Sequence, residues 1–302
     1  MYRVRPLLLA IAVAVAGTLP AGAAMAEEKG GSQLAPPAEQ SPPKANDWDC
    51  KPTTKHRNPV VLVHGLSANM ANNWWTMAPL LASRGYCVFA LTYGVDPRAP
   101  FPLDQMGGVV RMEQSAKELG AFVKKVLKKT GARKVDIVGH SEGSLMPNYW
   151  VKFMGGAKKV DRYVGLTPLW DGTEFFGVGT MHEMGEESGM SAEVAGLVAQ
   201  MCGSCPQFIR GSDFIEKMNE GGTPAVPGVT YTMIMTRHDE LVQPYTSGVL
   251  EGHTNIVVQD VCPEDFADHG GVAYDPISQQ LVLNALDPGR AQEPYCPSKA
   301  NS

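Results

Sequence analysis

Short apolar runs alternate with amphipathic stretches between residues 58 and 290. The runs are rich in β-branched and aromatic residues, which predicts buried strands at 60–63, 86–91, 135–138, 163–166, 229–235 and 255–258. The stretches between them predict helices at 74–83, 112–129, 145–153 and 277–286. This alternation predicts an α/β fold: a mostly parallel central sheet with helices on both faces and functional groups where strands end.

The start of the chain is typical of an export signal. Two arginines precede an apolar run over 7–16, and alanines at 24 and 26 provide small residues before a cleavage site. The run is shorter than the ~20 residues of a spanning helix, so a membrane anchor is the less favoured interpretation. We expect a signal peptide at 1–26, a disordered Pro-rich leader at 27–47 and a secreted, extracellular protein.

Composition fits a single globular domain. The chain has 302 residues, of which 44% are hydrophobic, so residues 48–302 are expected to form one domain with a sizeable core. Without residues 1–26 it keeps 24 basic and 31 acidic residues, a formal charge of −7. A nucleic-acid partner is therefore not expected, because its phosphates would be repelled.

Six cysteines in an exported chain indicate disulfides, for which many connectivities are open. Position along the chain favours the pairs Cys50–Cys87, Cys202–Cys205 and Cys262–Cys296. Cys202 and Cys205 also have the spacing of a redox-active dithiol, but that unit needs a strand before it and a helix behind it. Here a helical stretch precedes the pair and Pro206 follows it, which favours a structural bridge.

A G-x-S-x-G motif centred on Ser141 follows the expected strand at 135–138. A tight strand-to-helix turn requires small residues two positions before and after the serine, and Gly139 and Gly143 meet this requirement. The alternative is an ordinary serine in a glycine-rich turn, since a chain with 32 glycines produces such motifs by chance. The flanking strand and helix favour Ser141 as a catalytic nucleophile.

A serine nucleophile needs a base and an acid, which follow it in the order serine, acid, histidine in this kind of fold. Asp239 lies just beyond the strand at 229–235, and His269 lies in the loop after the last strand, so we predict both as catalytic. His253 is the rival base but precedes the strand at 255–258, at the wrong end for the active edge. A plain turn aspartate is the alternative for Asp239; the rival acids are Glu240, Asp260 and Asp268.

Backbone amides are expected to hold the oxyanion of the reaction. The candidates are the amide of Glu142, directly after the serine, and that of Leu66, in the loop after the first strand. His64 begins that loop and is expected to brace it by hydrogen bonds without transferring protons. A carboxylate at position 142 is unusual, but only the amide of that residue is needed.

Four segments together resemble secreted bacterial lipases and esterases of the α/β-hydrolase superfamily, particularly the actinomycete type. They are Val-Val-Leu-Val-His-Gly-Leu at 60–66, the serine motif, residues 236–248, and Val-Gln-Asp-Val-Cys-Pro before His269. The resemblance spans residues 58–290. It implies hydrolysis of carboxylic esters, often acylglycerols, through an acyl-enzyme, with His269 as base, Asp239 orienting it, and no cofactor. We also expect no metal, a monomer, and transient contact with a lipid interface.

Two groups of apolar residues are candidates for substrate binding. The segment 170–222, rich in Met and Phe, is either a cap-like helical insertion that binds the acyl chain or the buried face of an inserted helix. Trp74 and Trp75 follow the oxyanion loop, and at least one of them is expected to line the pocket.

Two other functions remain open at this point. An extracellular acyltransferase would use the same residues with an alcohol or sugar in place of water. A non-catalytic binding protein of the same fold would have no need of all three of Ser141, Asp239 and His269.

Overall fold

The computed structural model describes residues 39–174 and 202–297, so the segment predicted as a signal peptide lies outside the described residues. The strands are β1 (Val60–Val63), β2 (Val88–Leu91), β3 (Val135–His140), β4 (Val160–Leu166), β5 (Thr230–Met235) and β6 (Thr254–Val257). The helices are α1 (Met70–Trp74), α2 (Met77–Ser83), α3 (Met112–Thr130), α4 (Glu142–Phe153), α7 (Asp213–Met218), α8 (Val258–Val261) and α9 (Pro276–Leu286).

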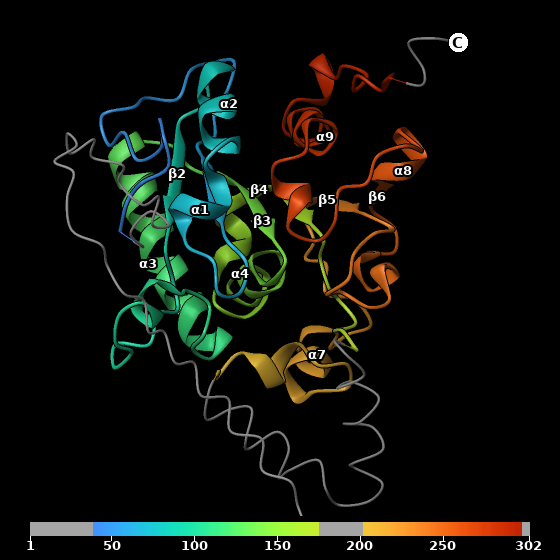
Figure 1. Ribbon diagram of the computed structural model, residues 1–302. Coiled ribbons are helices and arrows are strands. Elements are labelled where there is room, and N and C mark those ends of the chain that lie inside the picture. The colour runs from blue at the N-terminus through green and yellow to red at the C-terminus, as the bar shows by residue number, and fades with distance from the viewer. Residues whose placement is uncertain (1–38, 175–201, 298–302) are drawn as a thin grey trace, which may run out of the picture. The chain divides into compact units, whose positions relative to one another are not determined.

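The six strands form one parallel sheet in the order β2-β1-β3-β4-β5-β6 (Figure 1). This confirms the parallel α/β architecture predicted from the alternating pattern. The chain moves outward from β1 to β2 and then crosses to β3 on the other side of β1. Loops after β1 and β3 therefore meet at the carboxyl edge where the strand order reverses, which is where open α/β sheets bind ligands.

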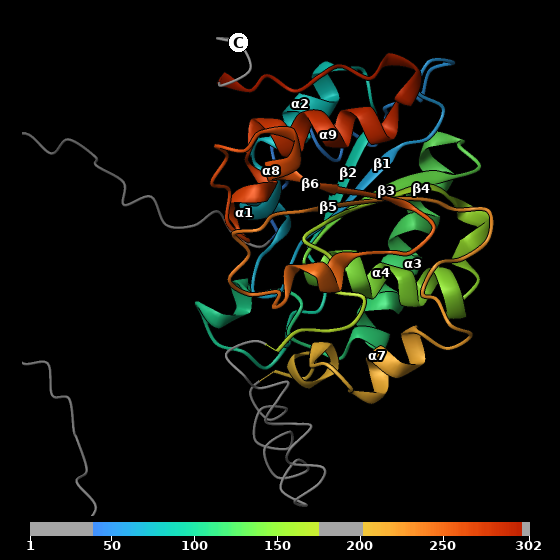
Figure 2. The same ribbon diagram turned by 90° about the vertical axis from the view of Figure 1, so that its right-hand side faces the viewer.

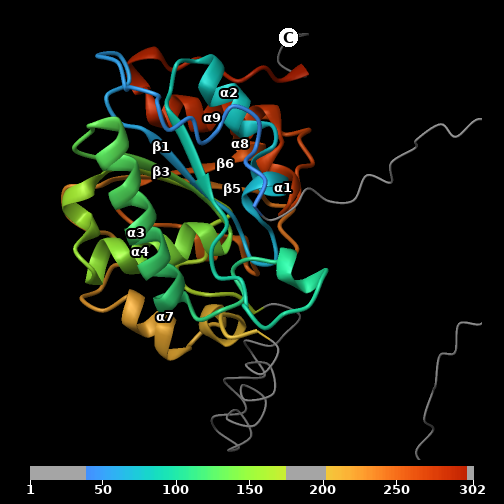
Figure 3. The ribbon, with the colours of Figure 1, turned by 90° about the vertical axis from the view of Figure 1, so that its left-hand side faces the viewer.

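Helices cover both faces of the sheet. Figures 2 and 3 show α1, α2 and α9 on one face and α3 and α4 on the other, with α7 beyond α4. Side chains alternate in direction along β1, so Val60 and Leu62 join the cluster under the first group, while Val61 and Val63 join the cluster under the second. All four side chains of β1 are fully buried, as expected for a central parallel strand.

The helix predicted at 74–83 is two helices in the structure. Asn69 caps α1 by accepting hydrogen bonds from the amides of Ala71 and Asn72, while the Asn72 side chain accepts from the amide of Asn69. This reciprocal cap starts a helix four residues earlier than the apolar spacing suggests. The earlier start was not predicted because Asn72 takes the place that Glu or Gln usually has in such a cap.

The ordered fold begins before residue 48, which corrects the predicted leader boundary. The amide of Asn46 donates to the carbonyl of Val88 (2.9 Å), and the Asn46 side chain exchanges hydrogen bonds with the backbone of Ala90 at 2.9 and 3.0 Å. Residues just before 48 therefore pair with the outer edge of β2, an arrangement that protects an edge strand from other partners.

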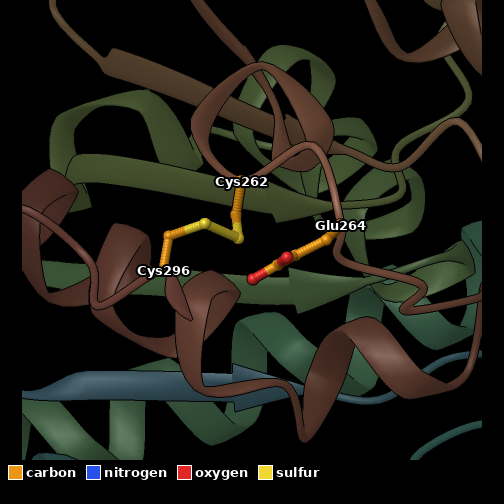
Figure 4. Close-up of side chains that lie close together, drawn as sticks. All are labelled: Cys262, Glu264 and Cys296. Atoms are coloured by element: carbon orange, nitrogen blue, oxygen red, sulfur yellow. A yellow bond between two sulfur atoms is a disulfide. The ribbon is translucent and has the colours of Figure 1, made fainter. Parts of the chain in front are cut away.

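Three disulfides link the pairs predicted from position: Cys50–Cys87, Cys202–Cys205 and Cys262–Cys296. Figure 4 shows the carboxylate of Glu264 beside the last of these. Because the two sulfurs are bonded to each other, neither is available as a thiolate ligand for a metal ion. Among the described residues, no helix has the length and apolar character needed to cross a membrane.

Candidate active site

Ser141 lies between β3 and α4 in a strained backbone conformation, with φ 56° and ψ −125°. A Cβ atom on Gly139 would lie 1.9 Å from the carbonyl oxygen of Gly143, and a Cβ on Gly143 would lie 2.1 Å from that of Val63. Both glycines are thus required by close approach of backbone to backbone, as the motif predicts. The turn holds Ser141 at the carboxyl edge of the sheet.

Asp239 and His269 lie side by side. A parallel bridge joins His238 to Asp268, so the next residue in each segment faces the other. The Nδ1 atom of His269 lies 2.9 Å from both carboxylate oxygens of Asp239, and both residues are buried. The structure therefore brings together the acid and base chosen from chain order.

Ser141 and His269 line the same cavity, of about 640 Å³, at the carboxyl edge of the sheet. Glu142 and residues of the loop after β1 line it as well. Large apolar side chains contribute to the lining: Leu66, Leu169, Phe208, Ile209, Leu241 and Val242. Phe208 and Ile209 belong to the segment predicted as an insertion, of which residues 175–201 lie outside the described residues.

The loop after β1 approaches Ser141 closely. Val63 pairs with Gly139 in the neighbouring strand, and a Cβ on Gly65 would lie 3.1 Å from the Cβ of Ser141. Within the described ranges, the amide of Leu66 donates no hydrogen bond to another residue. It and the amide of Glu142, at the first position of α4, are suited to receive an oxyanion from substrate.

His64 braces this loop and is not suited to proton transfer. Its Nδ1 lies 2.8 Å from the carbonyl of Gly65, its Nε2 accepts from the amide of Tyr93 (3.2 Å), and its ring stacks on that of Tyr93. Burial lowers the pKa of His64 to about 4, so the ring is neutral near pH 7.

Glu142 has an unusual environment. The residue is 1% exposed, and neither of its carboxyl oxygens has a hydrogen-bond partner among the described residues. Burial raises the pKa of Glu142 well above its ordinary range, with the nearby Ser204 hydroxyl opposing the rise. Burial therefore disfavours the charged form of this side chain.

Several residues considered from the sequence lie elsewhere. Trp74 is fully buried in the core beneath α1, Trp75 is 44% exposed, and neither lines the cavity, which corrects the prediction that one of them does. His253 lines a separate cavity of about 720 Å³ and packs edge-on against Tyr231. Asp260 is exposed and pairs with Arg237.

Glu240, a rival acid from the sequence, contacts the backbone of the residue predicted as the base. Its carboxylate accepts a hydrogen bond from the backbone amide of His269 (3.1 Å), and the residue lines the cavity. Two further residues were missed: Asn73 and His140 are buried beside Ser141 and hydrogen-bonded to each other. Only the position of His140 inside the serine motif could have drawn attention to it.

Residues 57–282 match the model of the lipase (class 2) family. The chain belongs to this family. Segments of 98 residues are 39% identical to triacylglycerol lipases of Pseudarthrobacter phenanthrenivorans and Burkholderia plantarii. The match covers 31% of this chain but spans only 28% and 25% of the length of those relatives.

Two solved lipase structures have the same fold as this member of the lipase (class 2) family. Lipase B of Aspergillus fumigatus matches with a TM-score of 0.61 at 18% identity, covering 86% of this chain and 57% of that one. A lipase of Bacillus licheniformis in its mature form matches with a TM-score of 0.56 at 15% identity, covering 78% and 94%. The chain has the α/β-hydrolase fold.

Proposed function

We propose that this chain is a secreted serine hydrolase that cleaves carboxylic esters, with acylglycerols as its substrate class. One arrangement carries the proposal. Ser141, in a strained backbone conformation at the sheet edge, lines the same cavity as His269. The ring of His269 is hydrogen-bonded to the buried carboxylate of Asp239. Membership in the lipase (class 2) family supports the same reaction.

In the proposed mechanism, His269 takes the proton of Ser141 as the serine oxygen attacks the ester carbonyl. The amides of Leu66 and Glu142 stabilise the tetrahedral oxyanion. His269 then gives its proton to the departing alcohol, which leaves an acyl-enzyme. Water attacks this intermediate with His269 again as base, and the carboxylic acid leaves. Asp239 holds the Nδ1 proton of His269 and stabilises the charged ring.

The substrate class rests on the cavity and on the relatives. The apolar side chains that line the cavity suit a hydrocarbon acyl chain. The curated relatives are named triacylglycerol lipases, which supports acylglycerols over small polar esters.

The proposal includes contact between the protein and a lipid interface. Phe101 is 70% exposed and Leu103 is 52% exposed, on a loop that is hydrogen-bonded to the cavity wall through Gly107 and Ala68. Exposed apolar groups beside a binding site mark a surface for apolar partners. We expect Phe101→Ser with Leu103→Ser to reduce adsorption to tributyrin droplets more than it reduces turnover of soluble esters. Equal losses in both assays would contradict interface contact.

Secretion is supported by the three disulfides, which persist in oxidising compartments. Residues 1–26 are proposed as the signal removed on export, and the mature protein as a monomer. Mass spectrometry of the N-terminus after secretion tests the first, and light scattering tests the second. A mature chain that keeps residue 1 would refute the signal assignment.

The function is tested with p-nitrophenyl esters of increasing acyl length, comparing wild type, Ser141→Ala and Ser83→Ala. Ser83 is exposed on α2, so its replacement controls for loss of a serine hydroxyl. Ser141→Ala is expected to lose at least ~1,000-fold in kcat/KM, while Ser83→Ala matches wild type.

The outcomes separate the alternatives. A folded wild type that is inert on every ester would sink the hydrolase proposal and favour a binding protein. Esters of an added alcohol, formed in preference to free acid, would favour an acyltransferase.

A further inference from the structure

A buried chain of polar contacts runs behind Ser141 and joins two loops of the site. The amide of Gly65 donates to Oδ1 of Asn73 (3.0 Å), and the same oxygen lies 3.1 Å from Nδ1 of His140. The other ring nitrogen of His140, Nε2, lies 2.8 Å from the backbone carbonyl of His269. The chain thus begins next to the Leu66 amide and ends at the residue that bears the base.

These contacts bridge parts of the sheet that are otherwise far apart. Gly65 follows β1 and His269 follows β6, and the strands β3, β4 and β5 lie between β1 and β6. His140, at the end of β3, lies between the two loops and contacts both sides through its two ring nitrogens. Its ring centroid is 5.2 Å from that of His269.

Asn73 and His140 are buried at the wall of the cavity. Asn73 is 5% exposed and His140 is 7% exposed, so losing a partner leaves a buried polar group with little solvent contact to replace it. Burial lowers the pKa of His140 to about 3, so the neutral ring carries one N–H and donates to only one of these two oxygens, while its other nitrogen contacts the second.

We infer that Asn73 and His140 are positioning residues for the proposed ester hydrolysis, holding the oxyanion loop in register with the loop of His269. The inference rests on the proposed function. An oxyanion forms only in the transition state, so a misplaced Leu66 amide slows the reaction without weakening substrate binding. Loss of the chain therefore acts on kcat and leaves KM nearly unchanged.

The side chain of Asn73 allows a matched pair of variants. Its Oδ1 accepts the bonds described, whereas its Nδ2 has no hydrogen-bond partner among the described residues. Asn73→Asp keeps the accepting oxygen and loses no bond, and Asn73→Leu keeps the size but removes the acceptor. Activity that follows the acceptor rather than the volume distinguishes positioning from packing.

Asn148→Leu serves as the control. Asn148 is another fully buried amide, which donates to the carbonyl of Pro224 and accepts from the hydroxyl of Tyr231, away from the cavity. Its replacement is expected to lower Tm but to leave kcat within about twofold of wild type.

The experiment measures kcat and KM on p-nitrophenyl butyrate together with Tm. Asn73→Leu is expected to lower kcat about 10- to 100-fold with KM within about twofold. Asn73→Asp is expected to stay within about fivefold of wild type. His140→Phe is expected to lower kcat as Asn73→Leu does, and the double variant to lose no more than either single one, because both break the same chain.

Three results would overturn the inference: an unchanged kcat in Asn73→Leu, an equal loss in Asn73→Asp and Asn73→Leu, or additive losses in the double variant. These differ from failure of the proposed function. In that case wild type itself is inert, or Ser141→Ala retains activity.

Discussion

The Nδ1 atom of His269 lies 2.9 Å from each carboxylate oxygen of Asp239. The carboxylate is itself held by the amides of Leu241 (2.9 Å) and Val242 (2.7 Å), which donate to Oδ1. An acceptor fixed in this way keeps the proton of neutral His269 on Nδ1 and leaves the lone pair on Nε2. That tautomer is the one a general base for Ser141 needs.

Asp239→Asn is therefore expected to lower kcat by about 10³- to 10⁴-fold with little change in KM, because the amide favours the wrong tautomer of His269. Steady-state kinetics on a soluble ester measures the loss. Asp260→Asn removes an exposed carboxylate that pairs with Arg237 and is expected to behave as wild type. If Asp260→Asn were the more damaging of the two, the assignment of the acid would be wrong.

Gly143→Ala is expected to destabilise the fold by more than about 4 kcal/mol, because the new methyl would lie 2.1 Å from one backbone oxygen and 2.3 Å from another. Urea unfolding measures the change. Gly131→Ala is the control: that glycine ends α3 at φ 76° with nothing within 4 Å, so only backbone strain of about 1 kcal/mol is expected. Equal losses at both positions would show that crowding at the elbow is not the cause.

The buried carboxyl of Glu142 predicts a pH dependence of stability. Its folded pKa is raised above the value of 4.5 expected in the unfolded chain, so unfolding releases a proton. The free energy of unfolding should therefore fall as pH rises from 4.5 toward the folded pKa. The Glu142→Gln variant has no carboxyl to titrate at this position. Its free energy of unfolding, minus that of wild type, should therefore increase as pH rises across that range.

Urea titrations at pH 5, 7 and 9 would measure the difference between Glu142→Gln and wild type. The same change at the exposed Glu251 should give a difference that does not grow with pH. A constant difference for Glu142→Gln would mean that the carboxyl is already ionised in the native protein.

Lys152 stabilises the end of α7. Its ammonium group donates to the carbonyls of Met218, Glu220 and Thr223, each at 2.7 Å. Lys152→Met keeps much of the stem but leaves these oxygens without the donor, so a loss of about 1–3 kcal/mol is expected from chemical unfolding. Lys128→Met, at an exposed position of α3, should stay within about 0.5 kcal/mol. If Lys152→Met left the free energy of unfolding unchanged, water would satisfy these carbonyls equally well.

Local steric rules explain why much of this protein was predictable. All six strands and α3, α4 and α9 follow from apolar runs and spacing within about 20 residues of chain. The glycines around Ser141 meet a requirement of the turn itself, so Ser141 could be proposed as the nucleophile without a fold. Chain order sufficed to select Asp239 and His269, which the structure brings side by side, because parallel strands all deliver their carboxyl ends to one edge.

Contacts between distant segments account for what was missed. Asn73 and His140 are 67 positions apart, and their bond exists only because β1 and β3 are neighbours in the sheet. The burial of Trp74 depends on how α1 packs against the sheet, where Trp74 joins the core cluster on that face. Asn46 is ordered because β2 leaves an unpaired edge beside it. Hydrophobic spacing selects which face of an element is buried, but the partner that each polar group finds depends on which elements become neighbours.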